Sequence, residues 1–316
     1  MSLSPCSTMT SLAKKTNVLT VSWYSGEWIS HLVNNLESKA SHPDRLEFTI
    51  IDNTNGNDKD LASALRKSSK ARILHFASKS SQPSRAHASA ITFGLSAIND
   101  SWCVLFDPDV YVFQHGWDQW CRSKILDEGY IAAGAPYPPW KLGKYHDFPS
   151  PIFAAMNLAR IQALNATWEP FFSSSLGLAY SFVMRKLFRA GGFLNRTRLT
   201  HSTSWRQIAY LGERLAGVYA PDTGYRIAAA ANRHNTTAYC LKTDWDGETV
   251  NTAGSPCWRN LANAYELFTE CGRPFAAHCY GSSMRQWRSR FSGNVGFFRD
   301  LCEACNETLH ADTPAR

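Results

Sequence analysis

The first third of the chain repeats one pattern, in which a short apolar run is followed by a polar break and then by apolar residues at helical spacing. The apolar runs predict strands at 18–22, 46–51, 72–76 and 102–106. Helical patterns separate these runs at 28–36, 58–66 and 84–98, and Ser84 is the expected N-cap of the last one. This alternation predicts an α/β fold with right-handed crossovers and a mainly parallel sheet flanked by helices.

The second half of the chain is patterned less regularly. With 316 residues and 44% hydrophobic residues, the chain can bury a large core. It has no internal repeat, no low-complexity linker and no run of 18 apolar residues. We therefore expect one domain with two lobes at 17–300, between a flexible tail at 1–16 and a second tail at 301–316.

The charge and the cysteines narrow the function classes. A formal net charge of +7 suits a partner that carries phosphate, such as a nucleotide-sugar, a nucleic acid or an anionic membrane surface. The basic residues are scattered rather than gathered in a stripe, so a nucleic acid is not expected. The nine cysteines, in a chain without an export signal, are expected to be reduced and mostly buried in a cytoplasmic protein. Cys302 and Cys305 form a CxxC without a second ligand pair, which is not enough for a zinc site.

Polar side chains follow three of the expected strands. Ser22, Asp52 and Asp107 each come at the end of an apolar run. Open α/β sheets bind ligands beyond the carboxyl ends of their strands. We therefore expect these three residues to face one crevice.

The chain contains three Asp-x-Asp pairs, and only one of them directly follows an apolar run. This pair is Asp107-Pro108-Asp109, and Pro108 stops the strand there. Two carboxylates in a crevice repel each other unless a cation lies between them, and Mg²⁺ or Mn²⁺ accepts carboxylate and phosphate oxygens together. The pair therefore predicts a metal site that neutralises a leaving diphosphate. The alternative is a simple strand-ending turn.

These motifs resemble the start of a family 2 glycosyltransferase. The matching segments are the strand and turn ending in Ser22-Trp23-Tyr24-Ser25-Gly26, the strand closing with Ile51-Asp52-Asn53-Thr54, and Leu105-Phe106-Asp107-Pro108-Asp109-Val110. The resemblance covers residues 18–112 well and the rest loosely. It implies a GT-A (Rossmann-like) fold, a nucleoside-diphosphate-sugar donor and inversion at the anomeric carbon. By this resemblance, 17–112 is the nucleotide-sugar-binding half and 113–300 the acceptor-binding half, with a mixed lobe.

The resemblance also implies roles for residues on the donor side. Asp52 matches the acid that recognises the nucleoside base, and Asp107 and Asp109 match the metal-binding pair. Ser22 and Tyr24, in the turn after the first strand, are expected donor contacts. In Pro83-Ser84-Arg85-Ala86-His87-Ala88, Arg85 is expected to reach a phosphate and His87 to line the donor pocket. The alternative for this segment is a capped helix with exposed polar residues.

The general base of an inverting transfer is less clear from the sequence. The family usually places an acidic pair after Gly-Gly-Phe, but here Gly191-Gly192-Phe193 is followed by Leu194-Asn195. Asp222, in Pro221-Asp222-Thr223-Gly224, is the substitute that we expect to take the proton from the acceptor. The alternative for Asp222 is a helix N-cap. The reserve candidates are Glu213, Asp244 and Asp246.

Four further expectations concern residues after 112. His278 follows an apolar run and is a candidate third metal ligand, the alternative being a buried and satisfied histidine. Arg285 and Arg288 are expected near the diphosphate. Trp140 is expected to lie exposed near the acceptor, which would be a glycan, a lipid-linked molecule or a protein. The basic, aromatic tail is compatible with peripheral contact with a membrane.

Two other functions compete with a transferase. A nucleotidyltransferase can share this sheet, but it would carry a Gly-rich basic loop after the first strand, which Ser22–Gly26 lacks. A non-catalytic module that binds glycans or partners would explain the missing acidic pair, but the intact Asp107 and Asp109 argue against it.

Overall fold

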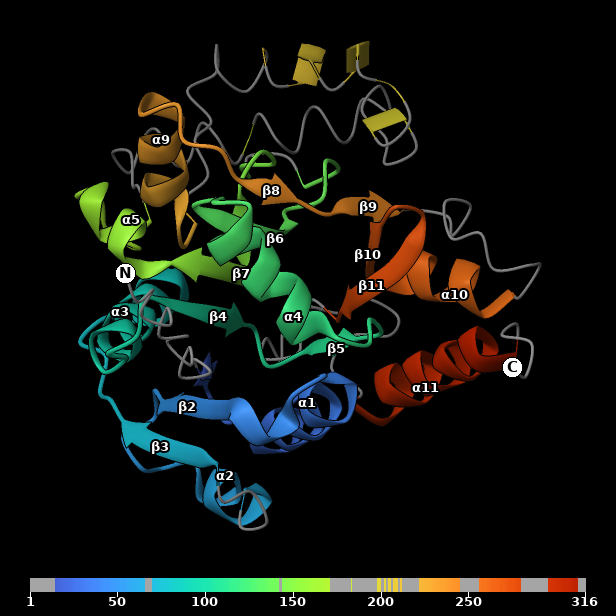
Figure 1. Ribbon diagram of the computed structural model, residues 1–316. Helices are drawn as coiled ribbons and strands as arrows, with labels where there is room; N and C mark the ends of the chain where they lie inside the picture. The colour runs from blue at the N-terminus through green and yellow to red at the C-terminus, as the bar shows by residue number, and fades with distance from the viewer. Residues whose placement is uncertain are drawn as a thin grey trace, which may run out of the picture.

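The computed structural model describes residues 15–65, 70–141, 144–170, 222–244, 256–279 and 295–311, together with scattered positions between 183 and 211. These residues form two sheets with helices packed around them (Figure 1). The expected α/β class is confirmed.

The larger sheet has seven strands in the order β3-β2-β1-β4-β7-β6-β8. Its strands are β1 (Thr16–Ser22), β2 (Leu46–Asp52), β3 (Ala71–His75), β4 (Trp102–Phe106), β6 (Ala132–Pro136), β7 (Pro149–Asn157) and β8 (Tyr239–Cys240). The strands β3, β2, β1 and β4 run parallel to one another, as the alternating pattern predicted. Strand β7 is antiparallel to both β4 and β6, and β8 is parallel to β6. The sheet is therefore mainly parallel in its N-terminal half and mixed beyond β4.

The smaller sheet has four antiparallel strands in the order β5-β11-β10-β9. Its strands are β5 (Val110–Val112), β9 (Lys242–Asp244), β10 (Glu266–Glu270) and β11 (Arg273–His278). Strand β4 of the larger sheet and β5 of the smaller one are separated only by the residues Asp107-Pro108-Asp109. The acidic motif therefore forms the link between the two sheets.

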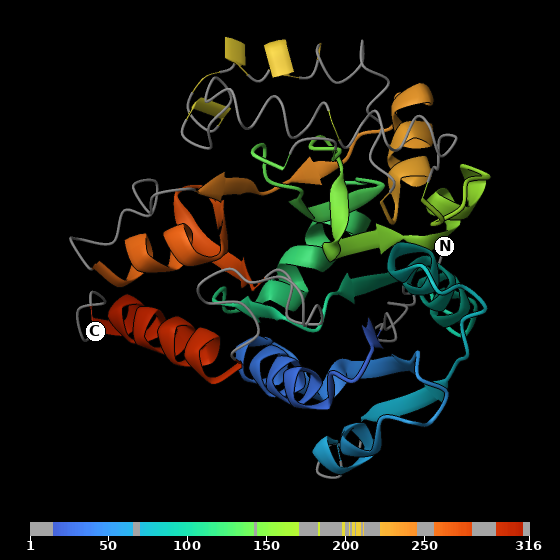
Figure 2. The same ribbon diagram turned by 180° about the vertical axis from the view of Figure 1, so that it is seen from behind.

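Helices cover the sheets on several sides. They are α1 (Gly26–Lys39), α2 (Lys59–Ala64), α3 (Pro83–Ser96), α4 (Trp117–Arg122), α5 (Leu158–Ala163), α9 (Tyr225–Arg233), α10 (Pro256–Ala264) and α11 (Val295–Ala311). A 3-10 turn (Pro43–Arg45) precedes β2, and a π-helical turn (Ser123–Asp127) continues α4. Helix α11 lies beside α1 in both views (Figures 1 and 2), where Trp28 and Phe298 pack with ring centroids 5.9 Å apart.

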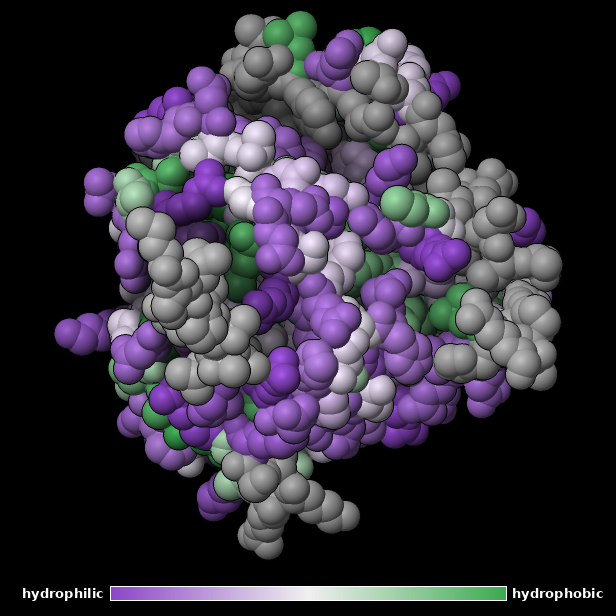
Figure 3. Space-filling model, viewed as in Figure 1, coloured by the Kyte–Doolittle hydropathy of each residue, from purple (hydrophilic) through white to green (hydrophobic). Residues whose placement is uncertain are grey.

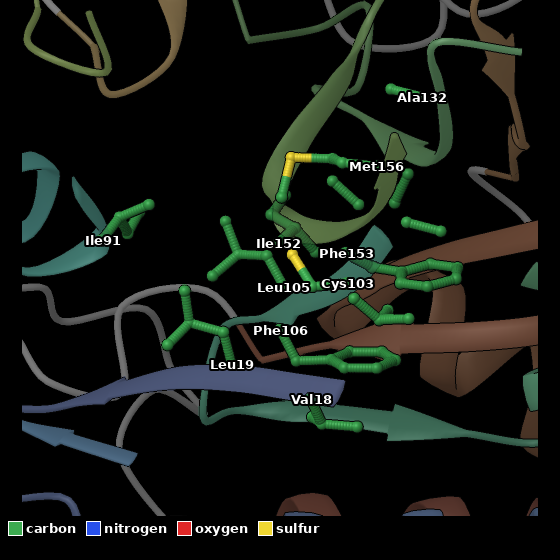
Figure 4. Close-up of a cluster of buried hydrophobic side chains, with 14 of the residues drawn as sticks. Val18, Leu19, Ile91, Cys103, Leu105, Phe106, Ala132, Ile152, Phe153 and Met156 are labelled. Atoms are coloured by element: carbon green, nitrogen blue, oxygen red, sulfur yellow. The ribbon is translucent and has the colours of Figure 1, made fainter. Parts of the chain in front are cut away.

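The main core lies on the larger sheet (Figure 4). The aromatic rings of Phe106 and Phe153, from the neighbouring strands β4 and β7, stack with centroids 4.7 Å apart. Leu19 of β1 and Ile91 of α3 are fully buried in the same core, so α3 packs on the sheet through its apolar face. A second cluster joins the smaller sheet to α10 and α11 through Trp258, Cys302 and Cys305.

Three expected boundaries were wrong. Thr16, assigned to the flexible tail, is the buried first residue of β1. The tail expected at 301–316 is helical to Ala311, because Cys302 and Cys305 are buried apolar residues that hold α11 in the second cluster. Helix α3 begins at Pro83 after Gln82, so Ser84 lies inside the first turn and is not the N-cap. Proline is favoured there because its fixed φ suits the first turn of a helix.

The surface in the view of Figure 3 is mostly hydrophilic, with hydrophobic residues scattered in small groups. Among the described residues, no helix is both long enough and apolar enough to cross a membrane.

Candidate metal and donor site

The turn that carries Asp107 and Asp109 is tied to both sheets by backbone hydrogen bonds. The amide of Asp107 donates to the carbonyl of Ile152 at 3.0 Å, which extends the ladder between β4 and β7. The carbonyl of Asp109 accepts from the amide of Cys279 at 2.9 Å, just beyond the pairing of β5 with β11. Both ends of the turn are therefore fixed, and the carboxylates are held at the carboxyl end of β4.

His278 completes a cluster of three metal-ligand groups. It ends β11 and is the register partner of Val110, so it lies directly across from the acidic turn. Its Nε2 is 3.1 Å from Asp109 Oδ1 and 3.9 Å from Asp107 Oδ2. One ligand atom from each of the three residues lies within 4.8 Å of the others. Two carboxylates and one imidazole at this spacing fit a divalent ion such as Mn²⁺. The structure thus brings together the three residues named as metal ligands from the sequence.

The charges of the cluster favour a cation. Burial raises the pKa of Asp107 most, and the nearby carboxylates of Asp109 and Asp222 raise it further, against the opposing effect of two histidines. Burial alone would lower the pKa of His278, but the carboxylates of Asp109 and Glu266 outweigh burial and raise it to about 10. Without a metal, a proton on His278 therefore balances part of the negative charge. A bound divalent ion would take over that role.

Two further groups surround the acidic turn. His87, on α3, has its Nε2 3.6 Å from Asp107 Oδ1, so it contacts that carboxylate from a different element than His278 does. Asp222 is buried, and its carboxylate pairs with Lys144 and accepts from the amide of Thr223. Asp222 does not cap α9, since the N-cap is Gly224 with a left-handed φ of 85°. The N-cap alternative for Asp222 is therefore wrong.

A buried ion pair supports His278 from behind. The second ring nitrogen, Nδ1, is 2.8 Å from Glu266 Oε2. Glu266 also pairs with Lys141, and both side chains are nearly inaccessible to solvent. The pKa of Glu266 is lowered because Lys141 and His278 outweigh the effect of burial, whereas burial dominates for Lys141 and lowers its pKa. Neither Glu266 nor Lys141 was among the residues expected from the sequence.

The carboxylate of Asp52 is fully engaged in hydrogen bonds with nearby residues. Its side chain is 1% exposed, and its two oxygens accept from the amide and hydroxyl of Thr54, from the amide of Gly56 and from the ring of His75. The pKa of Asp52 is lowered because these hydrogen bonds together outweigh burial, the largest single effect, which alone would raise it. The His75 ring itself is 59% exposed. Asp52 therefore orders the loop after β2 and presents His75 at the surface.

The hydroxyl of Ser22 is likewise engaged in a hydrogen bond within the protein. It is fully buried, and its hydroxyl donates to Asp58 Oδ2 at 3.1 Å. Asp58 also accepts from the amide of Ser25 and caps α2 through the amide of Leu61. The pair Asp58-Lys59-Asp60 thus contributes a buried acid that organises the turn after β1. Ser22 supports this turn rather than exposing a hydroxyl.

The same turn exposes two aromatic residues. Trp23 is 50% and Tyr24 is 60% exposed, and their rings meet edge to face at 5.6 Å. Tyr24 has a φ of 51°, which is unusual for a residue with a side chain and is held by the hydrogen bonds of Ser25 and Asp58. Arg85 is exposed on the first turn of α3. Tyr24 and Arg85 are therefore accessible to a ligand at the strand ends.

Trp140 is less exposed than expected from the sequence. It is half-buried and packs with Trp205 on a small cluster made by Leu199 and Ala209. An aromatic ring gains most from burying its faces, and these neighbours supply the apolar surface. Asp244, a reserve base, is buried at the end of β9. Other expected residues lie outside the described part of the chain: Gly191-Gly192-Phe193, Leu194-Asn195, Glu213, Asp246, Arg285 and Arg288.

No family model matches the chain, and no curated protein matches its sequence. Solved structures align with parts of it. TarS from S. aureus in complex with UDP-GlcNAc is 15% identical over 49% of this chain and 48% of that chain, with a TM-score of 0.37. This chain thus spans about half the length of the TarS fragment it matches.

Two shorter proteins align over more of the chain. The mannosyltransferase PcManGT from Pyrobaculum calidifontis, in complex with GDP-Man and Mn²⁺, is 12% identical over 70% of this chain and 80% of that chain, with a TM-score of 0.38. Mouse xyloside xylosyltransferase 1, in its apo form, is 9% identical over 72% of this chain and 85% of that chain, with a TM-score of 0.41. At such low identities and TM-scores, the geometry of the site is the guide to function.

Proposed function

We propose that this chain is a metal-dependent glycosyltransferase that moves a sugar from a nucleoside-diphosphate-sugar donor to an acceptor hydroxyl. The observation that carries the proposal is the cluster of Asp107, Asp109 and His278 at the carboxyl end of β4. Ligands of open α/β sheets bind at this end of the strands. A GT-A arrangement, with the donor over 17–112 and the acceptor over 113–300, is part of the same proposal.

The charges around the cluster match one divalent cation. Four carboxylates and two ammonium groups lie in contact or close to one another. With neutral histidines, their charges sum to two formal negative charges. The groups belong to Asp107, Asp109, Asp222, Glu266, Lys141 and Lys144. Oxygen ligands with one imidazole suit Mn²⁺, and Mg²⁺ is the second choice because it prefers an all-oxygen shell. The metal, when bound, supplies Lewis-acid stabilisation of the leaving diphosphate.

The residues around the metal ligands have separate roles in this proposal. His87, beside Asp107, lines the donor pocket and orients that carboxylate. Arg85, in the exposed first turn of α3, binds a phosphate oxygen. Tyr24 offers an exposed ring on which a base or sugar can stack. Asp52 contributes to base recognition through the loop that it orders.

Asp222 is the proposed general base of an inverting transfer. Its carboxylate is buried close to the metal ligands and is paired with Lys144. To accept a proton it must lose this partner, and a donor phosphate is a suitable new partner for the Lys144 ammonium group. The acceptor would then approach from the side of Trp140 and the loop 137–148. Glycan, lipid-linked and protein acceptors are all compatible, and a cytoplasmic location with peripheral membrane contact stays a prediction.

Two other functions can be distinguished from a glycosyltransferase by what happens to the donor. A nucleotidyltransferase would release pyrophosphate from a nucleoside triphosphate, whereas a glycosyltransferase releases a nucleoside diphosphate. A binding module would hold a glycan without consuming any donor. The turn after β1 is built around Ser22 and Asp58 without basic residues, which favours a sugar donor over a triphosphate.

The first experiment measures thermal stabilisation by UDP, GDP, CDP and dTDP, with and without Mn²⁺, on the wild type and on Asp109→Ala. We expect one nucleotide to raise the melting temperature of the wild type only when Mn²⁺ is present, and to have no effect on Asp109→Ala. If no nucleotide acts on the wild type, the transferase proposal is wrong and the binding module takes its place.

A further inference from the structure

Glu266 and His278 face each other across two antiparallel strands. They are direct register partners in the pairing of β10 with β11, so their side chains lie on the same face of the smaller sheet. His278 Nδ1 and Glu266 Oε2 are 2.8 Å apart, while His278 Nε2 is turned toward Asp109 at 3.1 Å. The ring therefore lies between two carboxylates, one at each of its nitrogens.

The burial of Glu266 needs a reason. The side chains of Glu266 and His278 are both 5% exposed, and that of Lys141 is 11% exposed. Transferring a carboxylate and an ammonium group out of water is costly, and an apolar pair of similar volume often stabilises a fold as well or better. The carboxylate is therefore better explained by what it does for His278 than by its contribution to folding.

We propose that Glu266 is a positioning residue for His278, held in place by Lys141. Because Glu266 accepts the Nδ1 proton, the neutral ring must keep its lone pair on Nε2, which is the atom that faces Asp107 and Asp109. A carboxylate behind a metal-bound histidine fixes the ring and raises its basicity. This inference rests on the proposed metal site and adds two residues to it, neither of which is among the three ligand groups.

Lys141 also links this support to the proposed base. It lies on the loop between β6 and β7, which carries Lys144 as well. Both ammonium groups lie over the ring of Tyr137, at 5.8 Å for Lys141 and 4.8 Å for Lys144. One loop therefore holds the partner of Glu266 and the partner of Asp222. The orientation of the metal ligand depends on the same loop as the availability of the base.

The test measures the binding of Mn²⁺, without any nucleotide, to the full chain. The two readouts are calorimetry and the electron paramagnetic resonance signal of free Mn²⁺. Four variants are compared with the wild type: Glu266→Gln, the charge-balanced double variant Lys141→Met with Glu266→Leu, the control Glu270→Gln, and the ligand variant Asp109→Ala. Glu270 lies on the same strand β10 but binds Tyr239 and Trp120 instead. The double variant separates folding from positioning, because it removes both members of the buried ion pair together.

We expect the double variant to melt within a few degrees of the wild type in the absence of metal and to bind Mn²⁺ about 10- to 100-fold more weakly. Glu266→Gln should also bind Mn²⁺ more weakly, and Glu270→Gln should bind it as the wild type does. If the wild type binds Mn²⁺ and Asp109→Ala does not, but both Glu266 variants bind it with unchanged affinity, the positioning role is wrong and the metal site stands. If the wild type itself binds no Mn²⁺, the metal site and the positioning role fail together.

Discussion

At the scale of single residues, the acids around the site and in the neighbouring loops carry out different tasks that depend on their partners. Asp107 and Asp109 both face His278 and lie close to each other, so a cation between them would relieve their repulsion. Asp222 and Glu266 are each neutralised by a lysine. Asp52 is satisfied by backbone amides and a hydroxyl of its own loop and by His75 of the neighbouring strand β3. The partners of each carboxylate, more than its position after a strand, decide what it can do.

The carboxylate of Asp52 should stabilise the fold in a pH-dependent way. Asp52→Asn removes its charge, and we expect a loss of about 1–3 kcal/mol in the free energy of unfolding at pH 7. The folded-state pKa of Asp52 is lowered, so this contribution is present above the unfolded-state pKa of about 4 and is lost as the pH falls through the folded-state value. Chemical denaturation from pH 7 to pH 2 measures it. The exposed Asp44→Asn is the control, and a difference that does not shrink in acid would contradict the prediction.

The carboxylate of Asp222 should act on the rate and not on the metal. For Asp222→Asn we expect donor turnover to fall about 10²- to 10⁴-fold, which is the usual effect of losing a general base. The affinity for Mn²⁺ should fall far less than the rate, because Asp222 acts on the site only through its charge and is not among the three ligand groups. Release of the nucleoside diphosphate measures turnover. Asp147→Asn, an exposed acid on the same loop as Lys144, is the control, and equal rates in the two variants would exclude Asp222 as the base.

At the scale of elements, α3 packs on the sheet through a glycine. A methyl group added at Gly94 would lie 2.5 Å from Leu19 Cδ1 and 2.9 Å from Ile51 Cγ1, so either these side chains or the helix would have to shift. The close approach matters for the site because α3 carries His87 to Asp107.

The packing of α3 can be tested with Gly94→Ala, because the direction of the change in stability depends on it. In an exposed helix the change would stabilise by up to about 1 kcal/mol through helix propensity. Here we expect a loss of about 1–3 kcal/mol, because overpacking outweighs propensity. Ser96→Ala, exposed on the same helix, should change stability by less than about 0.5 kcal/mol. Thermal melting distinguishes the two, and stabilisation by Gly94→Ala would show that the contact relaxes freely.

The elements of the first third were predictable because their local patterns agree with their burial. Strands β1, β2 and β4 are apolar-rich segments buried almost throughout, and α1 has its apolar residues on one side. The metal ligands could be named because Asp107 and Asp109 follow such a run and His278 ends another. Glu266 and Lys141 could not, since a buried ion pair depends on two distant segments meeting, and neither residue stands out from its neighbours in the sequence. The start of α3 was misplaced because Ser84 resembles a cap, while Pro83 already fits the first turn.

At the scale of the whole molecule, the metal site lies where the two sheets meet. The amide of Asp107 bonds β7 in the larger sheet, and the amide of Cys279, just after β11 of the smaller sheet, bonds the carbonyl of Asp109. A cation held by Asp107, Asp109 and His278 would therefore join the sheets as well as serve the chemistry.

Amide hydrogen exchange should show whether a bound cation links the two sheets. At a Mn²⁺ concentration of 100 times its dissociation constant, binding adds about 2.7 kcal/mol to the stability of the bound state. We expect exchange of the Asp107 and Cys279 amides to slow by up to about 100-fold, because their opening separates the ligands. The amide of Phe76, which bonds the carbonyl of Asp52 beside the edge strand β3, should change less. Equal slowing at all three amides would mean that the metal stabilises the fold only as a whole.

The position of His278 late in the chain also bears on the order of assembly. Asp107 and Asp109 leave the ribosome long before β11, and more than half of the chain separates them from their third ligand. Domains whose contacts join distant segments form them late in folding. A nascent chain that has completed its first strands still cannot hold the ion with all three groups. Metal capture would thus mark the completion of the fold, and a truncated product lacking β11 would compete poorly for a divalent ion.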